Sequence, residues 1–112
     1  MIKKFNQFLF ILLANGIFSF DVAAQTGGEQ LYVQNCLICH ADDGAGAMPG
    51  IAGLAENRNW SKISEDELLA KIKQGIVSPG AAIAMPPKGG NPDLTDSDIR
   101  KILKYIRMEF LK

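Results

Sequence analysis

Cysteine, histidine and net charge are all scarce in this 112-residue chain, whose length allows one small domain. Two cysteines exclude a scaffold of several disulfides, and together with a single histidine they fall one short of the four ligands of a structural zinc site. Twelve basic and twelve acidic side chains cancel, so no strongly basic surface is available for nucleic acid. The hydrophobic fraction of 47% is too high for a disordered tail.

The chain also lacks an apolar run of about 20 residues, the length needed to cross a bilayer. An uncharged, largely apolar stretch, residues 8–20, follows Lys3 and Lys4 and precedes the small residues Ala23 and Ala24. This order is typical of a secretory signal peptide. We predict that residues 1–24 are a signal peptide and residues 25–112 the mature domain, exported to the periplasm with no stable membrane insertion. An uncleaved membrane anchor is the alternative.

Three segments of the predicted mature domain start with a helix-capping pattern. In each, a hydroxyl side chain is followed three positions later by an acidic one, and the caps are Thr26, Ser64 and Thr95. We expect helices over residues 27–36, from 65 to about 75 with Gly75 as the C-terminal cap, and from 96 towards 110. Apolar residues at helical spacing form one stripe on the last of these helices: Ile99, Ile102, Leu103, Ile106 and Phe110.

Glycine and proline dominate the remaining segments. Residues 42–53 hold four glycines and a proline, and residues 78–92 hold three glycines and four prolines. Neither segment alternates apolar and polar residues, so we predict an all-α chain with no strand. Two such long loops in so small a chain indicate that something other than side chains fills its centre.

Both cysteines and the only histidine lie in one string, Cys36-Leu37-Ile38-Cys39-His40. In a C-x-x-C-H string, each thiol adds to one vinyl group of haem, and the histidine that follows reaches the iron. We therefore predict that Cys36 and Cys39 form thioethers to one haem c and that His40 is an axial ligand of its iron.

Three other uses of this string fit the sequence less well: a zinc site, a redox dithiol and a structural disulfide. Zinc normally needs a fourth Cys or His ligand, and a redox dithiol normally lies in a βαβ unit, which this sequence does not predict. A structural disulfide across two residues of a helix has poor geometry. Covalent haem attachment accounts best for the whole string.

A haem held by His40 needs a second axial ligand, and three methionines follow the predicted signal peptide: Met48, Met85 and Met108. Met108 lies on the last predicted helix, opposite its apolar stripe, and should face solvent. Met85 precedes Pro86 and Pro87, which disfavour helix at Met85 and stiffen the loop around it. We predict that Met85 binds the iron, with Met48 as the alternative.

Together these residues resemble class I c-type cytochromes, most nearly the cytochrome c5 group. Five segments carry the resemblance: Gly28-Glu29-Gln30-Leu31-Tyr32, the C-x-x-C-H string, Trp60, Met85-Pro86-Pro87-Lys88-Gly89-Gly90 and Ile102-Leu103-Lys104-Tyr105. The resemblance implies a small all-α fold of three or more helices wrapped around one covalently attached haem. It departs from many c5-type proteins, which place two cysteines where this chain has Asn91 and Leu94.

With His40 and Met85 on the iron, no substrate reaches it, so we predict a one-electron carrier cycling between Fe(III) and Fe(II) rather than an enzyme. Redox proteins that dock transiently would be its partners. The alternative is a haem-binding gas sensor or haem enzyme subunit with an exchangeable sixth ligand.

Supporting roles are predicted for several other residues. Gly28 should let the first and last helices approach closely, with Tyr32 and Tyr105 packed at the crossing. A carbonyl near Pro49 is expected to accept a hydrogen bond from the His40 ring. The remaining candidates are Arg58 and Trp60 for the haem propionates and Lys88 for partner docking.

Overall fold

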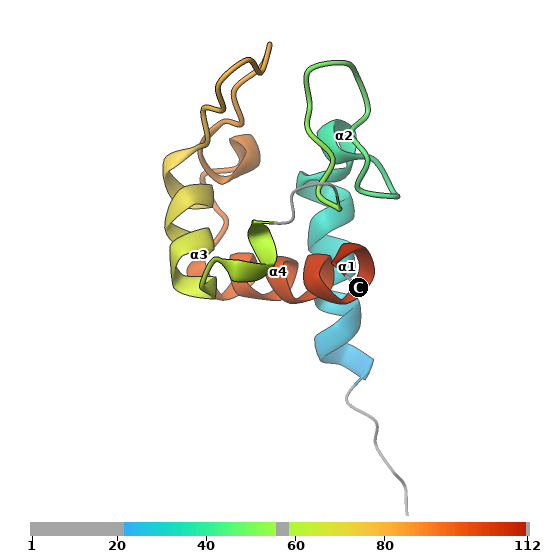
Figure 1. Ribbon diagram of the computed structural model, residues 1–112. Coiled ribbons are helices and arrows are strands. Elements are labelled where there is room, and N and C mark those ends of the chain that lie inside the picture. The colour runs from blue at the N-terminus through green and yellow to red at the C-terminus, as the bar shows by residue number, and fades with distance from the viewer. Residues whose placement is uncertain (1–21, 56–58, 112) are drawn as a thin grey trace, which may run out of the picture.

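The computed structural model describes residues 22–55 and 59–111, and helices are the only regular elements within these ranges (Figure 1). In chain order they are α1 (Val22–Asn35), α2 (Leu37–His40), the 3-10 turn η1 (Trp60–Lys62), α3 (Glu65–Gln74), the 3-10 turn η2 (Pro87–Gly90) and α4 (Asp96–Phe110). One isolated antiparallel bridge joins Ile76 and Met85. The all-α prediction is confirmed. None of the described helices is both long and apolar enough to cross a membrane.

Two of the three predicted caps start helices. The Ser64 hydroxyl accepts a hydrogen bond from the Glu67 backbone N–H, and Gly75 caps the other end of α3. Thr95 forms a reciprocal capping box with Asp98 at the start of α4. The prediction for Thr26 is wrong, because α1 already begins at Val22 and passes through that position.

Helix α4 crosses both α1 and α3, which stand towards its two ends (Figure 1). Gly28 makes the crossing with α1 possible, since an added Cβ would run into the Lys101 carbonyl and lie 3.1 Å from the Tyr105 Cβ. The Tyr32 and Tyr105 rings pack beside it with centroids 5.3 Å apart, and Phe110 joins them. The predicted close approach is confirmed.

The core lies on the inner faces of these helices. Its buried residues are Tyr32, Leu54, Leu68, Leu69, Ile72, Leu94, Ile99, Ile102, Leu103 and Ile106. Ile99 and Leu103, from the predicted stripe of α4, are fully buried. Burial of each such side chain contributes about 1.5–3 kcal/mol to stability.

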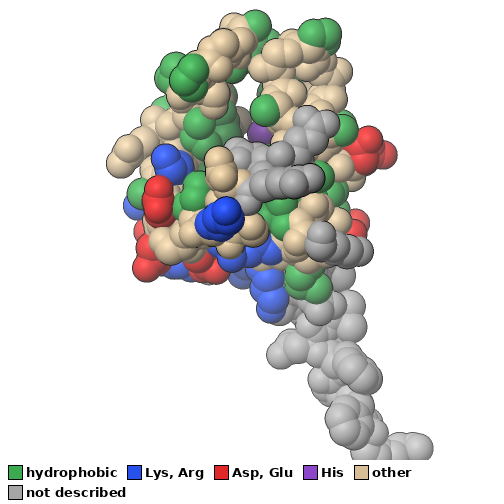
Figure 2. Space-filling view, viewed as in Figure 1, with side chains coloured by type: hydrophobic (Ala, Val, Ile, Leu, Met, Phe, Trp, Pro, Cys, Tyr) green, Lys and Arg blue, Asp and Glu red, His purple; other side chains and the backbone are tan. Residues whose placement is uncertain are grey.

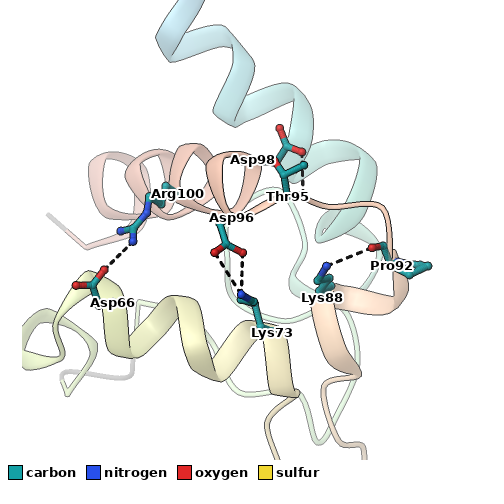
Figure 3. A network of polar contacts seen from close by, with 8 residues as sticks. All are labelled: Asp66, Lys73, Lys88, Pro92, Thr95, Asp96, Asp98 and Arg100. Atoms are coloured by element: carbon teal, nitrogen blue, oxygen red, sulfur yellow. Dashed lines mark hydrogen bonds and ion pairs between the residues drawn. The ribbon is translucent and has the colours of Figure 1, made fainter.

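Charged side chains tie α3 to α4 (Figure 3). The Arg100 guanidinium lies 2.7 Å from a carboxylate oxygen of Glu65 and 2.7 Å from one of Asp66. Lys73 Nζ lies 2.9 Å from Asp96 Oδ1. These exposed pairs set the relative placement of the two helices more than they add stability.

Two glycine-rich loops extend to the same side of the helices, one after α2 and one after α3 (Figure 1). They meet where Gly50 approaches Ala82, and a Cβ on Gly50 would lie 2.9 Å from the Ala82 Cβ. Gly50 also has φ +93°, in the left-handed region that glycine adopts without strain. Residues far apart in sequence thus enclose a common space.

Candidate functional site

The C-x-x-C-H string occupies the junction between α1 and α2. The Cys36 N–H donates to the Tyr32 carbonyl at 2.8 Å, and the His40 N–H donates to the Cys36 carbonyl at 2.9 Å. These bonds continue the helical path, so Cys39 and His40 lie one turn after Cys36. Both thiols are free and partly buried. Within residues 22–55 and 59–111, no three His, Cys, Asp or Glu side chains form a group that could hold a metal ion.

Cys36, His40 and Met85 line one apolar cavity, although Met85 comes from a different loop. The empty space in and around this cavity, including the part that is open to solvent, is about 420 Å³. Side chains of α3, α4 and the loops complete the wall: Leu54, Trp60, Ile72, Lys88, Gly89, Leu94, Ile99, Ile102 and Ile106. Cys39 is not part of this lining. In the space-filling view, a histidine side chain is visible where the surface is hollowed between the two loops (Figure 2).

Backbone pairing holds Met85 in place. Its N–H donates to the Ile76 carbonyl at 2.9 Å, and the Ile76 N–H donates back to the Met85 carbonyl at 3.0 Å. Gly75 allows this pairing, because a Cβ there would lie 2.9 Å from the Met85 carbonyl oxygen. The extended backbone predicted for the residue before Pro86 is therefore present.

The other two methionines lie outside the cavity wall. Met108 is 43% exposed on α4, as predicted, and Met48 is 46% exposed on the loop after α2. Neither lines the cavity. Of these three methionines, Met85 is the one that lines the cavity together with His40.

Burial shifts the pKa of two groups in the C-x-x-C-H string. It lowers the pKa of His40, which favours the neutral imidazole, the form that binds metals. It also raises the pKa of the Cys36 thiol to about 11, with a smaller contribution from Cys39. His40 Nδ1 is buried without a hydrogen-bond partner, so the predicted bond to a carbonyl near Pro49 is absent.

Tyr32 braces the turn that follows His40, a role that the sequence did not predict. Its hydroxyl donates a 2.6 Å hydrogen bond to the Ala41 carbonyl. Ala41 has φ +63° and ψ 172°, a conformation that costs about 1–3 kcal/mol for a residue with a side chain. The bond to Tyr32 helps to hold this strained turn, which ends α2 immediately after His40.

The other predicted residues have mixed outcomes. Trp60 lines the cavity from η1, whereas Arg58 lies outside the described residues. Lys88 also lines the cavity, and its Nζ donates to the Pro92 carbonyl at 3.2 Å (Figure 3). Asn91 stands at a position where many c5-type proteins have a cysteine. Its Nδ2 donates a hydrogen bond to Asn35 Oδ1 at 2.8 Å.

Residues 23–106 match the protein family described as cytochrome C oxidase, cbb3-type, subunit III. The chain belongs to this cytochrome c family. Cytochrome c-555 of Prosthecochloris aestuarii is 34% identical to this cytochrome over 89 residues, which are 75% of this chain and 86% of that protein. The recognised resemblance to class I cytochromes c is thereby confirmed.

Solved structures support the same fold. Cytochrome cL from Hyphomicrobium denitrificans superposes with a TM-score of 0.55 at 27% identity, covering 78% of this chain. This cytochrome spans only about half of that protein, 48% of its length. A structure described as the electron transfer complex of nitrite reductase with cytochrome c matches with a TM-score of 0.52 and 29% identity, over 74% of this chain and 93% of that one.

This cytochrome therefore has one covalently bound haem c with its iron, and it is an electron carrier rather than an enzyme. The residues present suit that group. The cavity is apolar, as small-molecule and cofactor sites predominantly are. The free Cys36 thiol and the partly buried His40 imidazole, whose Nδ1 has no partner, line it, and the free Cys39 thiol lies beside them in sequence but outside the lining. This donor set has the chemistry of thioether attachment and iron ligation.

Proposed function

We propose that this chain is a periplasmic one-electron carrier in which Cys36 and Cys39 bind haem covalently while His40 and Met85 are the axial ligands of its iron. The observation that carries the proposal is the meeting of Cys36, His40 and Met85 in one apolar cavity. Haem, when bound, supplies an iron that cycles between Fe(III) and Fe(II). Soft thioether ligation favours Fe(II) and raises the reduction potential.

The residues around the two proposed ligands limit the reorganisation that electron transfer would require. His40 is held by the helical hydrogen bond to Cys36 and by the braced turn at Ala41. Met85 is paired through its backbone with Ile76 and followed by two prolines of fixed φ. Ligands held by such contacts keep their positions in both oxidation states.

The apolar wall has a second role, which is to exclude water from the site. Ile99, Ile102 and Ile106 present one face of α4 to the cavity, and Leu54 and Trp60 reach it from the loop after α2 and from η1. A dry environment disfavours the additional positive charge of Fe(III), which again favours the reduced state. Leu54 and the three isoleucines are all buried.

A redox partner is proposed to dock at the loop side of the molecule. Residues 44–55 and 74–87 carry no charged side chain, and several of their apolar side chains are exposed, with Val77 85% and Ile83 49% accessible. The matched cytochrome c in complex with nitrite reductase supports a partner that is itself a redox protein. Such transient contacts bury less than about 1,200 Å².

Export is proposed from residues 1–24, of which 1–21 lie outside the described residues. Mass spectrometry of the protein from the periplasmic fraction tests removal of this segment and haem attachment together. We expect the mass of residues 25–112 plus one haem. The full-length mass in a membrane fraction would instead support the uncleaved anchor.

Visible spectroscopy of methionine variants tests the proposed axial ligand. We expect a low-spin ferric spectrum with the methionine–iron charge-transfer band at the red edge, lost in Met85→Ala and retained in the matched controls Met48→Ala and Met108→Ala. A band that survives Met85→Ala would refute ligation by Met85. A high-spin wild type that takes up carbon monoxide or cyanide readily would favour the gas sensor or haem enzyme with an exchangeable sixth position.

A further inference from the structure

We infer that the side chains of Asn35 and Asn91 form an amide clasp that positions the Met85 loop against the helix leading into the haem-attachment string. The clasp is the 2.8 Å hydrogen bond from Asn91 Nδ2 to Asn35 Oδ1, which joins residues 56 positions apart. The inference rests on the proposed role of Met85 as an iron ligand. It assigns to Asn35 and Asn91 a positioning role, without contact to the iron.

The two asparagines lie next to the two segments that line the cavity from different parts of the chain. Asn35 is the last residue of α1 and immediately precedes Cys36. Asn91 ends the η2 turn, six residues after Met85. Both side chains are partly buried. The clasp therefore links the cysteine end of the cavity to its methionine end across the sequence.

Both amide groups of the clasp have further partners. Asn35 Nδ2 donates to the Leu31 carbonyl at 2.8 Å, within α1. Asn91 Oδ1 accepts a hydrogen bond of 3.0 Å from the Asp93 backbone N–H. In each side-chain amide, the Nδ2 group thus donates one hydrogen bond and the Oδ1 atom accepts another, and this pattern sets the orientation of the amide. The result is a continuous path of hydrogen bonds from the body of α1 to the end of the methionine loop.

The η2 turn is one that needs such an anchor. Lys88, Gly89 and Gly90 have φ of +54°, +63° and +87°, three successive residues in the left-handed region. Gly89 packs directly on the end of α1, because a Cβ there would lie 3.1 Å from the Asn35 carbonyl oxygen. Left-handed backbone at a non-glycine residue such as Lys88 is unfavourable and persists where surrounding contacts hold it.

Met85 is thus tied on both sides along the chain. Its own backbone pairs with Ile76 beyond the end of α3, and the clasp fixes the following turn to α1. Loss of the clasp leaves the pairing of Met85 with Ile76 intact, but it lets the η2 turn move relative to α1 and α2. The weak thioether ligand is then displaced more easily, while His40 keeps its own contacts.

Ligand displacement in the holoprotein tests the clasp. The affinity of the ferric protein for imidazole is measured for wild type, Asn35→Ala, Asn91→Ala and the double variant. We expect each single variant to bind imidazole about tenfold more tightly, the size of one hydrogen bond's contribution to an equilibrium constant. The double variant should bind no more tightly than either single one, because both substitutions remove the same bond.

Asp93→Ala is the matched control, since it removes an exposed polar side chain from the same loop and keeps the backbone N–H that Asn91 uses. It should bind imidazole as wild type does. Unfolding by guanidinium is followed in parallel, and a purely structural role would lower stability without changing imidazole affinity. If Asn91→Ala does not fold, Asn35→Ala removes the same bond from the other side.

Wild-type affinity in both single variants, or additive effects in the double variant, would overturn the clasp. Failure of the proposed function has a different signature. In that case the wild-type protein itself lacks the methionine–iron band, and Met85→Ala leaves the spectrum unchanged. The two outcomes are therefore separable in one set of samples.

Discussion

The helical side and the loop side of this small cytochrome are built on different principles. On the helical side, α3 and α4 start at side-chain caps, exchange ion pairs and bury a continuous apolar stripe. On the loop side, residues 44–55 and 74–87 have no charged side chain, and several positions have left-handed φ. In the space-filling view, red and blue side chains gather mainly over the helices (Figure 2).

This difference divides the contributions of the two sides. Caps, ion pairs and a buried stripe stabilise α3 and α4, and three isoleucines of that stripe also line the cavity. The loops bring few buried side chains of their own, and their apolar residues Met48, Val77 and Ile83 remain exposed. An exposed apolar surface next to a cofactor site favours brief contact with another protein. The predictions below test how far the two sides differ, from the largest effect to the smallest.

Truncation of a core residue on the helical side should have the largest effect. Leu103→Ala removes a fully buried side chain and should lower the free energy of unfolding by about 2–5 kcal/mol. Ile83→Ala, on a loop position that is 49% exposed, should change it by about 0.5 kcal/mol or less. Chemical denaturation of both variants measures the difference. Equal losses would mean that the loops contribute to the core as much as α4 does.

The crossing of α1 and α4 should be sensitive at a single glycine. Gly28→Ala should destabilise the protein by about 1–3 kcal/mol, because its Cβ has no room beside the Lys101 carbonyl. Gly27→Ala is the neighbouring control, with its closest contact at 3.9 Å, and should leave stability unchanged or raise it by up to about 1 kcal/mol. Thermal unfolding compares the pair, and similar melting temperatures would contradict the close crossing.

Tyr32→Phe should have a smaller effect, since it removes one hydrogen bond, to the Ala41 carbonyl, and keeps the aromatic packing. We expect a loss of about 1 kcal/mol at pH 8. Burial raises the pKa of Tyr32 above its usual value of about 10, so the wild type loses stability as the pH rises above that value and the unfolded chain ionises. Phenylalanine lacks this contribution, and the stability difference should narrow by pH 11.

Tyr105→Phe is the control for that measurement, because Tyr105 packs in the same aromatic cluster and its hydroxyl makes no hydrogen bond among the described residues. Its stability at pH 8 should match wild type. A loss equal to that of Tyr32→Phe would show that the hydroxyl bond to Ala41 contributes nothing specific.

Salt should have the smallest effect, on electron transfer to a redox partner. An uncharged docking surface predicts that the second-order rate constant changes less than about twofold between low and high ionic strength. Stopped-flow kinetics with a purified partner measures this. A rate constant that falls or rises steeply with salt would instead indicate that the partner docks at the charged face of α3 and α4, where Lys101, Lys104 and Arg107 lie together.

Local patterns were the most reliable guide to the fold. The caps at Ser64 and Thr95 and the stripe of α4 depend on neighbouring residues, and they are present as predicted. The described residues also form no strand, as predicted. Thr26 shows the limit of such patterns, because it has a capping pattern and yet α1 begins four residues before it, at Val22. The hydrogen bond expected from His40 to a carbonyl near Pro49 is also absent, because His40 Nδ1 has no partner.

Residue type and short spacing were sufficient to predict the family, which the comparisons confirm. The same local signals give the haem-attachment string and the choice of Met85, which stay predictions. Contacts between distant segments became visible only in the folded chain. The approach of Gly50 to Ala82, the brace from Tyr32 to Ala41 and the clasp of Asn35 with Asn91 are of this kind. They arise where helices cross and loops converge, and a hydrogen bond or close contact there leaves no periodic signature in either segment.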